Sequence, residues 1–289
     1  MDQYQNLRVM TFNLLSSAKK SKSFPWSQRR EGIVEVFETL QPDVVGTQEA
    51  NLEQLNDLRD RLPGYDFVGE GNLGPDQAGN EDSWYSAIFY RRSTVKLLPM
   101  PGESFWLSPS PERPASRFAL ASRPRVAVWS LFEHRDTGKP FLFGTTHLEA
   151  FMPGHRRHGA RLIQEYVQRK LKEMGQDMPV FLTGDFNASS GSSEIRDLGQ
   201  ETGDRAALQD AWSHAGHDEG PHAATFRGVD FRDRIGNWLL GHRRIDYVFF
   251  RGQLEVSTVD RVDFDQMLAD SSTPPSDHYP VVAEFKLAG

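Results

Sequence analysis

The sequence predicts a mixed fold of helices and strands, of the α/β or α+β class, in one domain over residues 1–289. Three observations lead to this prediction. Short apolar runs typical of buried strands recur along the chain, some segments repeat apolar residues at helical spacing, and hydrophobic residues make up 38% of the chain, enough for a sizeable core. No run of about eighteen apolar residues occurs, so we expect no membrane-spanning helix.

The expected strands are short, apolar segments, and several of them end in a polar residue. In chain order they cover residues 7–13, 43–49, 86–91, 126–132, 141–148, 180–187, 245–251 and 281–287. Runs such as Val180-Phe181-Leu182 are typical of strands that are covered on both faces. Strand periodicity alone does not determine the number of layers.

Helices are expected between these strands. After Trp26 and Ser27, apolar residues at positions 33, 36, 37 and 40 follow the spacing of one helix face. A helix over residues 52–62 ends at a Pro-Gly pair, and a helix over residues 155–173 has one apolar and one basic face. The loop-rich stretches 69–83 and 100–125 are expected to be surface excursions of the same domain rather than linkers.

The composition excludes several classes of protein. The chain has no cysteine, which excludes disulfide scaffolds, thiolate metal sites and cysteine nucleophiles. Its 33 Lys and Arg against 40 Asp and Glu give a net charge of -7, which argues against tight binding of duplex nucleic acid. The N-terminus lacks the pattern of a signal peptide, so a cytoplasmic location is expected, although a secreted protein whose leader has been removed would look the same.

Polar side chains that suit catalysis collect at the ends of the expected strands. They are Asn13, Glu49, His147, Asp185, Asn187, Asp246, Asp277 and His278. Each of them alone also fits a solvated loop, a turn, a helix cap or a core histidine. Asp185 and Asn187 are two residues apart, so in an extended chain they face the same side. Because strand ends of open sheets often carry sites, we expect the set as a whole to be functional.

The ordered set of motifs resembles the endonuclease/exonuclease/phosphatase superfamily, which has the DNase I-like fold. The motifs are Thr11-Phe12-Asn13, Gln48-Glu49, Thr146-His147-Leu148, Gly184-Asp185-Phe186-Asn187, Ile245-Asp246-Tyr247 and Ser276-Asp277-His278-Tyr279-Pro280. The resemblance spans roughly residues 7–287, and residues 26–30 and 87–91 are similar to a bacterial branch near the deadenylase-like members. It implies a four-layer α/β/β/α sandwich, with two mixed β-sheets packed face to face, helices outside, and the site where the sheets meet at one edge.

The resemblance also implies metal-dependent hydrolysis of a phosphoester, with Mg²⁺ or Mn²⁺ as cofactor. Glu49 would be the principal metal ligand, and Asn13 and Asp277 would complete or support the metal shell. Asp185 would position or deprotonate the attacking water.

The resemblance assigns the remaining residues to the phosphate. Asn187 and His147 would hold its non-bridging oxygens. Asp246 would accept a hydrogen bond from His278, whose other nitrogen would face the phosphate.

Electrostatics supports a metal independently of the resemblance. If Glu49, Asp185, Asp246 and Asp277 share one pocket, their mutual repulsion would force some of them to bind protons unless a cation is present. Carboxylate and amide oxygens are the ligands that Mg²⁺ prefers. The chain lacks a His-x-His-x-Asp-His pattern near His147, which disfavours a di-zinc hydrolase.

The sequence offers several candidates for contact with the substrate. Four basic residues could reach a phosphate, or else they could be ordinary surface charges: Arg29, Arg91, Arg125 and Arg123. Trp238, in the stretch 231–242 that also contains His242, could stack on a base or sugar, or else pack within its loop. We expect a monomer acting on a small phosphoester or a short single-stranded nucleic acid. The alternative is a catalytically silent module that binds a phosphorylated ligand.

Overall fold

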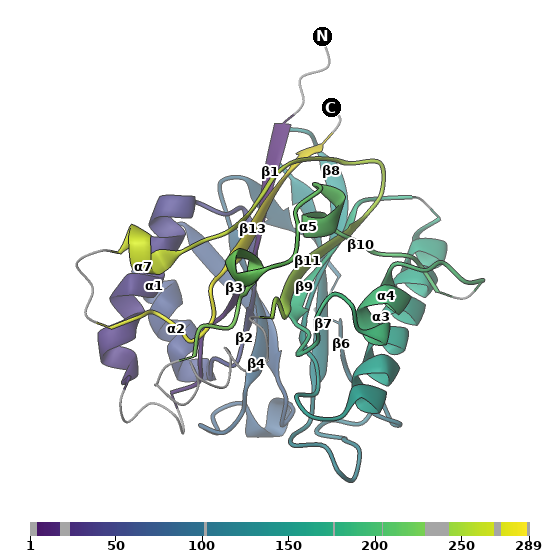
Figure 1. Ribbon diagram of the computed structural model, residues 1–289, viewed down its shortest axis with the longest axis horizontal. Coiled ribbons are helices and arrows are strands. Elements are labelled where there is room, and N and C mark those ends of the chain that lie inside the picture. The colour runs from purple at the N-terminus through teal and green to yellow at the C-terminus, as the bar shows by residue number, and fades with distance from the viewer. Residues whose placement is uncertain are drawn as a thin grey trace.

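The chain folds into two β-sheets packed face to face, with helices on both outer sides (Figure 1). This computed structural model describes residues 5–17, 24–100, 103–175, 177–203, 205–228, 243–268 and 273–287. The arrangement confirms the predicted four-layer α/β/β/α sandwich. None of the helices in the described part of the chain is long and apolar enough to cross a membrane.

The first sheet has six strands in the order β12-β13-β1-β2-β4-β3. Their bounds are β1 (Gln5–Asn13), β2 (Val44–Gln48), β3 (Tyr65–Gly71), β4 (Tyr85–Arg91), β12 (Glu255–Arg261) and β13 (Val281–Leu287). The two central strands β1 and β2 run parallel, and the other pairs are antiparallel. Asn13 and Glu49 therefore emerge at the same end of this sheet.

The second sheet has seven strands, six of them in the order β10-β11-β9-β8-β7-β5, with β6 also paired to β7. Their bounds are β5 (Val95–Leu97), β6 (Glu103–Trp106), β7 (Val126–His134), β8 (Lys139–His147), β9 (Val180–Asp185), β10 (Gln209–Asp210) and β11 (Asp246–Arg251). The only parallel pair in this sheet's described strands is β8 with β9, so His147 and Asp185 also emerge at one end.

The helices cover the outer faces of the two sheets (Figure 1). Helices α1 (Trp26–Leu40), α2 (Leu52–Arg61) and α7 (Phe264–Met267) lie on the side of the first sheet, and α3 (Pro153–Met174) and α4 (Ser193–Leu198) on the side of the second. The shorter elements are α5 (Ala211–His214), η1 (Pro75–Gln77) and η2 (Pro221–Ala223). Local chemistry determines some ends: Asn51 and Gln54 form a capping box at the start of α2, and Gly175, with φ 63°, ends α3.

Three apolar clusters hold the four layers together. The middle cluster lies between the sheets and includes Phe141, Phe181 and Phe285. The outer clusters bury Phe37 of α1 against the first sheet and Tyr166 of α3 against the second. Burial of such side chains contributes about 1.5–3 kcal/mol each before the entropic cost of folding.

The two parallel strand pairs face each other across the middle cluster. A Cβ atom at Gly46 of β2 would lie 1.9 Å from Oγ1 of Thr183 in β9, and 2.5 Å from Oγ1 of Thr145 in β8. Only glycine allows this close approach of the sheets. As a consequence, the polar ends of β1, β2, β8 and β9 meet at one end of the sandwich.

The predicted strands and helices are present with small shifts at their ends. The strand expected over 180–187 ends at Asp185, and the one expected from 245 begins at Asp246. The prediction missed β3, β5, β6, β10 and β12, and the stretch 100–125, expected to be a loop, contains β6.

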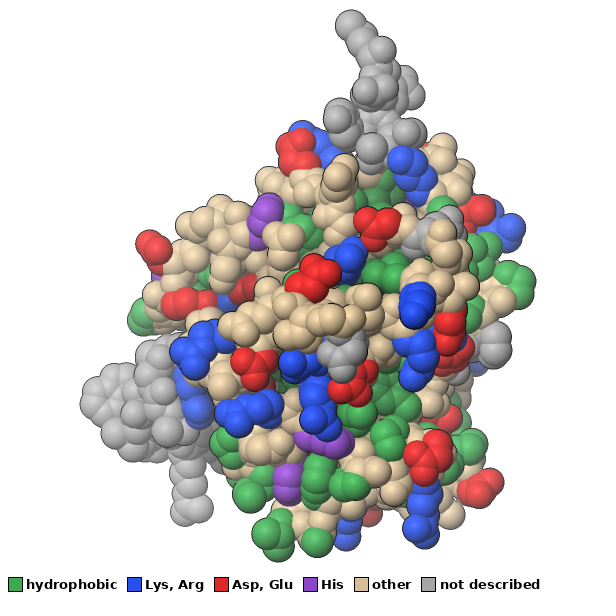
Figure 2. All heavy atoms as spheres, turned by 90° about the vertical axis from the view of Figure 1, so that its right-hand side faces the viewer, with side chains coloured by type: hydrophobic (Ala, Val, Ile, Leu, Met, Phe, Trp, Pro, Cys, Tyr) green, Lys and Arg blue, Asp and Glu red, His purple; other side chains and the backbone are tan. Residues whose placement is uncertain are grey.

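Figure 2 shows the face formed by α3 and α4, where basic and acidic side chains are interspersed. On α3, for example, Arg161 pairs with Glu165 at 3.4 Å.

Candidate active site

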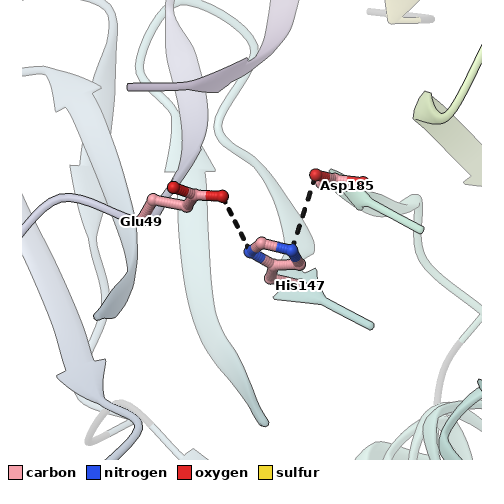
Figure 3. A group of neighbouring side chains, drawn as sticks. All are labelled: Glu49, His147 and Asp185. Carbon is pink, nitrogen blue, oxygen red and sulfur yellow. Dashed lines mark ion pairs between the residues drawn. The ribbon is translucent and has the colours of Figure 1, made fainter. Parts of the chain in front are cut away.

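Two carboxylates and an imidazole from both sheets converge at the end of the sandwich. Glu49 follows β2, His147 ends β8 and Asp185 ends β9 (Figure 3). Nδ1 of His147 lies 4.0 Å from Oε1 of Glu49, and its Nε2 lies 3.5 Å from Oδ2 of Asp185. Each of the three offers a ligand atom within 4.8 Å of the others, so the group could hold a metal ion.

Asn13 joins the two carboxylates of this group. Its Nδ2 donates to Oε1 of Glu49 at 3.2 Å and to Oδ2 of Asp185 at 3.1 Å, and the side chain is fully buried. Its Oδ1 accepts a hydrogen bond from the backbone N–H of Leu15 at 3.1 Å. We expected Asn13 to ligate or support the metal. The amide nitrogen faces both carboxylates and the amide oxygen accepts from the backbone, an arrangement that fits the supporting role.

Asn187 turns back toward His147 instead of continuing the strand. Its backbone has φ 49°, and its N–H donates to Oδ1 of Asp185 at 2.9 Å. The segment is therefore not extended as expected, yet the side chains of Asp185 and Asn187 both reach Nε2 of His147, at 3.5 and 2.9 Å. The amide Nδ2 of Asn187 donates to the carbonyl of Leu148 at 3.1 Å and lies 2.9 Å from Nε2 of His147. Glu49 also has a left-handed backbone, with φ 70°, and such strain tends to collect at functional sites.

His147 is neutral in this arrangement. Because the Asn187 amide nitrogen is a donor, Nε2 of His147 accepts, and its proton lies on Nδ1, toward Glu49. Burial lowers the pKa of His147 well below its usual value, and the charges of Arg125, His278 and Arg123 lower it further. A neutral His147 can therefore donate a hydrogen bond without adding charge.

Asp246 and His278 form a second buried pair beside Asp185. Oδ2 of Asp246 lies 2.8 Å from Nδ1 of His278, whose Nε2 lies 3.8 Å from Oδ2 of Asp185. Burial lowers the pKa of His278, but the charge and hydrogen bond of Asp246, with the charges of Asp185 and Asp277, raise it well above its usual value. His278 is therefore an imidazolium whose Nε2 points toward the first cluster.

Asp185 lies where the two groups meet. Burial raises the pKa of its carboxyl to about 7, with further upward contributions from Asp246 and Glu49 against the opposing effects of His278 and the Asn187 N–H. A carboxyl group in this range can exchange a proton near neutral pH.

Asp277 is buried next to His278 in the chain, with 4% of its surface exposed. It does not belong to either of the two groups of close ligand atoms found among the described residues. The preceding Ser276 donates from Oγ to the carbonyl of Asn13 at 2.6 Å, which fixes the loop of Asp277 against the end of β1. Its charge contributes to the raised pKa of His278, and it opposes the burial that lowers the pKa of Arg29.

Arg29 is not a substrate contact, contrary to our expectation. It is fully buried, and its guanidinium donates four hydrogen bonds to backbone carbonyls. The acceptors are Leu14, Leu15, Phe24 and Pro275, at 2.7–3.0 Å. Arg29 therefore connects the segment that follows Asn13 to the segment that precedes Asp277. It stabilises the site by holding these two segments together.

Two further expected contacts do not join the site. Arg91 binds Asp43, at the end of β2 and β4 away from Glu49, so this expectation is also wrong. An antiparallel strand places its first and last residues at opposite ends of the sheet, and β4 begins, rather than ends, at the site. Trp238 and the neighbouring His242 lie outside the described residues.

Arg125 does lie at the site end of the sandwich. It directly precedes β7 and its side chain is 8% exposed. Its Nε lies 3.8 Å from Oε2 of Glu149, a buried carboxylate that follows Leu148. The sequence contains this acid directly after the His147 motif, but it offered no role for it.

Trp84, which was not expected at the site, lies next to His147, and Arg123, one of the expected substrate contacts, lies over Trp84. The Trp84 ring stacks on His147, with centroids 6.1 Å apart and planes 21° apart. Cζ of Arg123 lies 3.4 Å from the centre of the Trp84 ring. A tryptophan directly before the strand that begins at Tyr85 was the available clue.

Comparisons with known proteins show the family of the chain. A model of the Endonuclease/Exonuclease/phosphatase family matches residues 10–278. Nocturnin of Drosophila melanogaster is 24% identical over 330 residues, which cover 98% of this chain and 47% of the relative. Human Tyrosyl-DNA phosphodiesterase 2 is 22% identical over 268 residues, which cover 90% of this chain and 64% of the relative. The chain thus spans about half to two thirds of these relatives.

Solved structures show the same fold. A mannosyl-6-phosphatase of Bacteroides thetaiotaomicron is 26% identical, with a TM-score of 0.77 over 96% of this chain and 99% of that chain.

Proposed function

Because the chain belongs to the Endonuclease/Exonuclease/phosphatase family, we propose that it is a phosphoester hydrolase that depends on Mg²⁺ or Mn²⁺. The observation that carries the proposal is the convergence of Glu49, His147 and Asp185 from two sheets, next to the Asp246–His278 pair. The named relatives include a phosphodiesterase and a phosphatase, so the substrate would be a small phosphoester or a short single-stranded nucleic acid.

The residues present fit a divalent cation. Burial, with the charges of Asp246 and Glu49, raises the pKa of Asp185 to about 7, and a cation would stabilise the ionised carboxylates. Glu49 would hold the ion, with Asp277 as a further oxygen ligand and Asn13 keeping Glu49 in place. When bound, the ion would polarise a phosphoryl oxygen and offset charge on the leaving oxygen.

The chain's own groups would carry out the remaining steps. Asp185 would orient the attacking water and accept its proton, since its pKa lies near neutral pH. Neutral His147 would donate a hydrogen bond from Nδ1 to a non-bridging oxygen of the phosphate, and Asn187 would keep the ring in place from Nε2.

On the other side of the phosphate, the His278 imidazolium would bind a further oxygen through Nε2. Asp246 would fix the orientation of its ring through Nδ1. These donors are held in place before the substrate arrives, which is the most effective form of electrostatic stabilisation.

A metal-dependent substrate screen tests the proposal. The screen would contain plasmid DNA, oligo(A), bis-p-nitrophenyl phosphate, p-nitrophenyl phosphate, inositol phosphates and sphingomyelin. We expect EDTA to abolish hydrolysis of at least one of them and Mg²⁺ or Mn²⁺ to restore it. Glu49→Gln should lower turnover by about 10²-fold or more. Absence of hydrolysis across the screen, with metal binding retained, would instead favour a silent binding module.

A further inference from the structure

Arg125 is a buried cation at the site that pairs with Glu149 but has no hydrogen-bond acceptor among the described residues. It precedes β7, in which Ala127 lies opposite Thr146 of β8, so Arg125 is level with the chain that leaves β8 after His147. Its side chain is 8% exposed, and no described residue accepts a hydrogen bond from its buried Nε. Because an unsatisfied buried donor is costly, this arrangement points to a ligand that supplies the acceptor.

Glu149 balances the charge of Arg125 without satisfying its donors. The distance of 3.8 Å from Oε2 of Glu149 to Nε exceeds that of a hydrogen bond. The carboxylate instead accepts from the N–H of Ser122 at 3.4 Å, from Oγ of Ser122 at 3.1 Å and from the N–H of Phe151 at 3.3 Å. Glu149 therefore fixes the segments of Ser122 and Phe151, and it leaves the guanidinium of Arg125 without a hydrogen bond to any described residue, so the Nη groups at the 8% of its surface that is exposed would pair with an anion.

The surrounding charges favour a strongly anionic ligand at this position. Burial lowers the pKa of Arg125, but the charges of Glu149, Asp185 and Glu49 raise it, and guanidinium stays protonated in proteins. These carboxylates would repel an anion that approaches the site. A permanent cation next to them offsets one additional negative charge on the ligand.

Building on the proposed function, we propose that Arg125 binds a non-bridging oxygen of a terminal phosphate and so selects phosphomonoesters over phosphodiesters. A phosphomonoester has three non-bridging oxygens and up to two negative charges, whereas a diester has two such oxygens and one charge. In the reaction, the oxygen of water bonds to phosphorus and the ester P–O bond breaks. The leaving oxygen takes a proton, and the products are an alcohol and inorganic phosphate.

Two substrates that differ by one methyl group test this proposal. With Mn²⁺ present, kcat/KM is measured for p-nitrophenyl phosphate and for methyl p-nitrophenyl phosphate, which have the same leaving group. We expect the wild-type protein to prefer the monoester. Arg125→Gln should reduce that preference by about tenfold to a hundredfold, the scale of one lost charge-assisted hydrogen bond. Arg251→Gln, at the far end of β11, is the matched control and should leave the preference unchanged.

The outcomes separate this inference from the proposed function. If neither substrate nor any member of the wider screen is hydrolysed with metal present, the proposed function fails. If hydrolysis depends on metal but Arg125→Gln lowers kcat/KM for both substrates equally, or the wild-type protein prefers the diester, the role of Arg125 is wrong.

If Arg125→Gln fails to fold, competitive inhibition of the wild-type protein by two anions tests whether the site prefers a phosphate without ester groups. Inorganic phosphate should then inhibit at least about tenfold more strongly than dimethyl phosphate, and equal inhibition would overturn the proposal.

Discussion

Asp246 and His278 are 32 residues apart in the chain, yet Oδ2 of one and Nδ1 of the other lie 2.8 Å apart in the buried part of the site. Thr225 positions the carboxylate, because its Oγ1 accepts from the backbone N–H groups of Ile245 and Asp246. The pair keeps an imidazolium next to Asp185, in a place where burial alone would remove its proton.

Asp246→Asn should therefore make hydrolysis more sensitive to high pH. Loss of the carboxylate charge lowers the pKa of His278, so the imidazolium is lost at a lower pH than in the wild-type protein. We expect kcat/KM to fall by about 10²-fold and the basic limb of its pH profile to move to lower pH. His278→Ala should abolish that limb, and an unchanged profile in Asp246→Asn would contradict the role of the pair.

Asp185→Asn should change how the stability of the metal-free protein depends on pH. The pKa of Asp185 is raised from 3.8 to about 7, so the folded state binds this proton more tightly than the unfolded state. The resulting stabilisation is complete below about pH 3.8 and is lost as pH rises through 7. In EDTA, Asp185→Asn should thus gain stability relative to the wild-type protein between pH 4 and pH 7, approximately the interval between these two pKa values.

Urea unfolding across this pH range measures the effect. The exposed Asp177 provides a matched control, because Asp177→Asn should give a constant difference from the wild-type protein. A constant difference for Asp185→Asn as well would show that its carboxyl is not perturbed.

Arg29→Met should destabilise the fold strongly. The substitution leaves four backbone carbonyls without the donors that they have in the native protein, in a place closed to water. We expect a loss of about 3 kcal/mol or more in the free energy of unfolding, against about 0–1 kcal/mol for Arg251→Met, whose ion pair is exposed. Urea unfolding at neutral pH distinguishes the two, and similar losses would contradict the support role of Arg29.

Asn13→Ala should weaken metal binding without removing a direct ligand. Its amide holds Glu49 and Asp185 at 3.2 and 3.1 Å, and loss of such outer contacts typically costs about 10–100-fold in metal affinity. Calorimetric titration with Mn²⁺ measures this. An unchanged affinity would mean that the two carboxylates keep their positions without Asn13.

Local patterns predicted most of the strands and the polar residues at their ends, whereas the four layers were predicted only by the family resemblance. Apolar runs that end in Glu49, His147 and Asp185 belong to parallel strand pairs, and such strands deliver their last residues to one end of a sheet. Short strands such as β5 (Val95–Leu97) escaped prediction because three residues do not establish a period.

The roles of the arginines could not be predicted from the sequence. A positive charge does not indicate whether a guanidinium is buried, or which end of its strand faces the site. Arg29 donates its hydrogen bonds to backbone carbonyls, and Arg91 lies at the end of β4 that is away from the site. The sequence left a turn in Gly-Asp-Phe-Asn open as an alternative, because Asp and Asn favour turns with side chain-to-backbone hydrogen bonds, but it did not decide between the turn and an extended strand.

Direct titration of the metal-free protein with Mn²⁺, in the wild-type form and as Glu49→Gln, tests the proposed metal site most directly. We expect the wild-type protein to bind the ion and Glu49→Gln to bind it at least about tenfold more weakly, since a carboxylate ligand is replaced by a neutral amide. Equal affinity in the two proteins would contradict the claim that Glu49 holds a divalent cation at the meeting point of the two sheets.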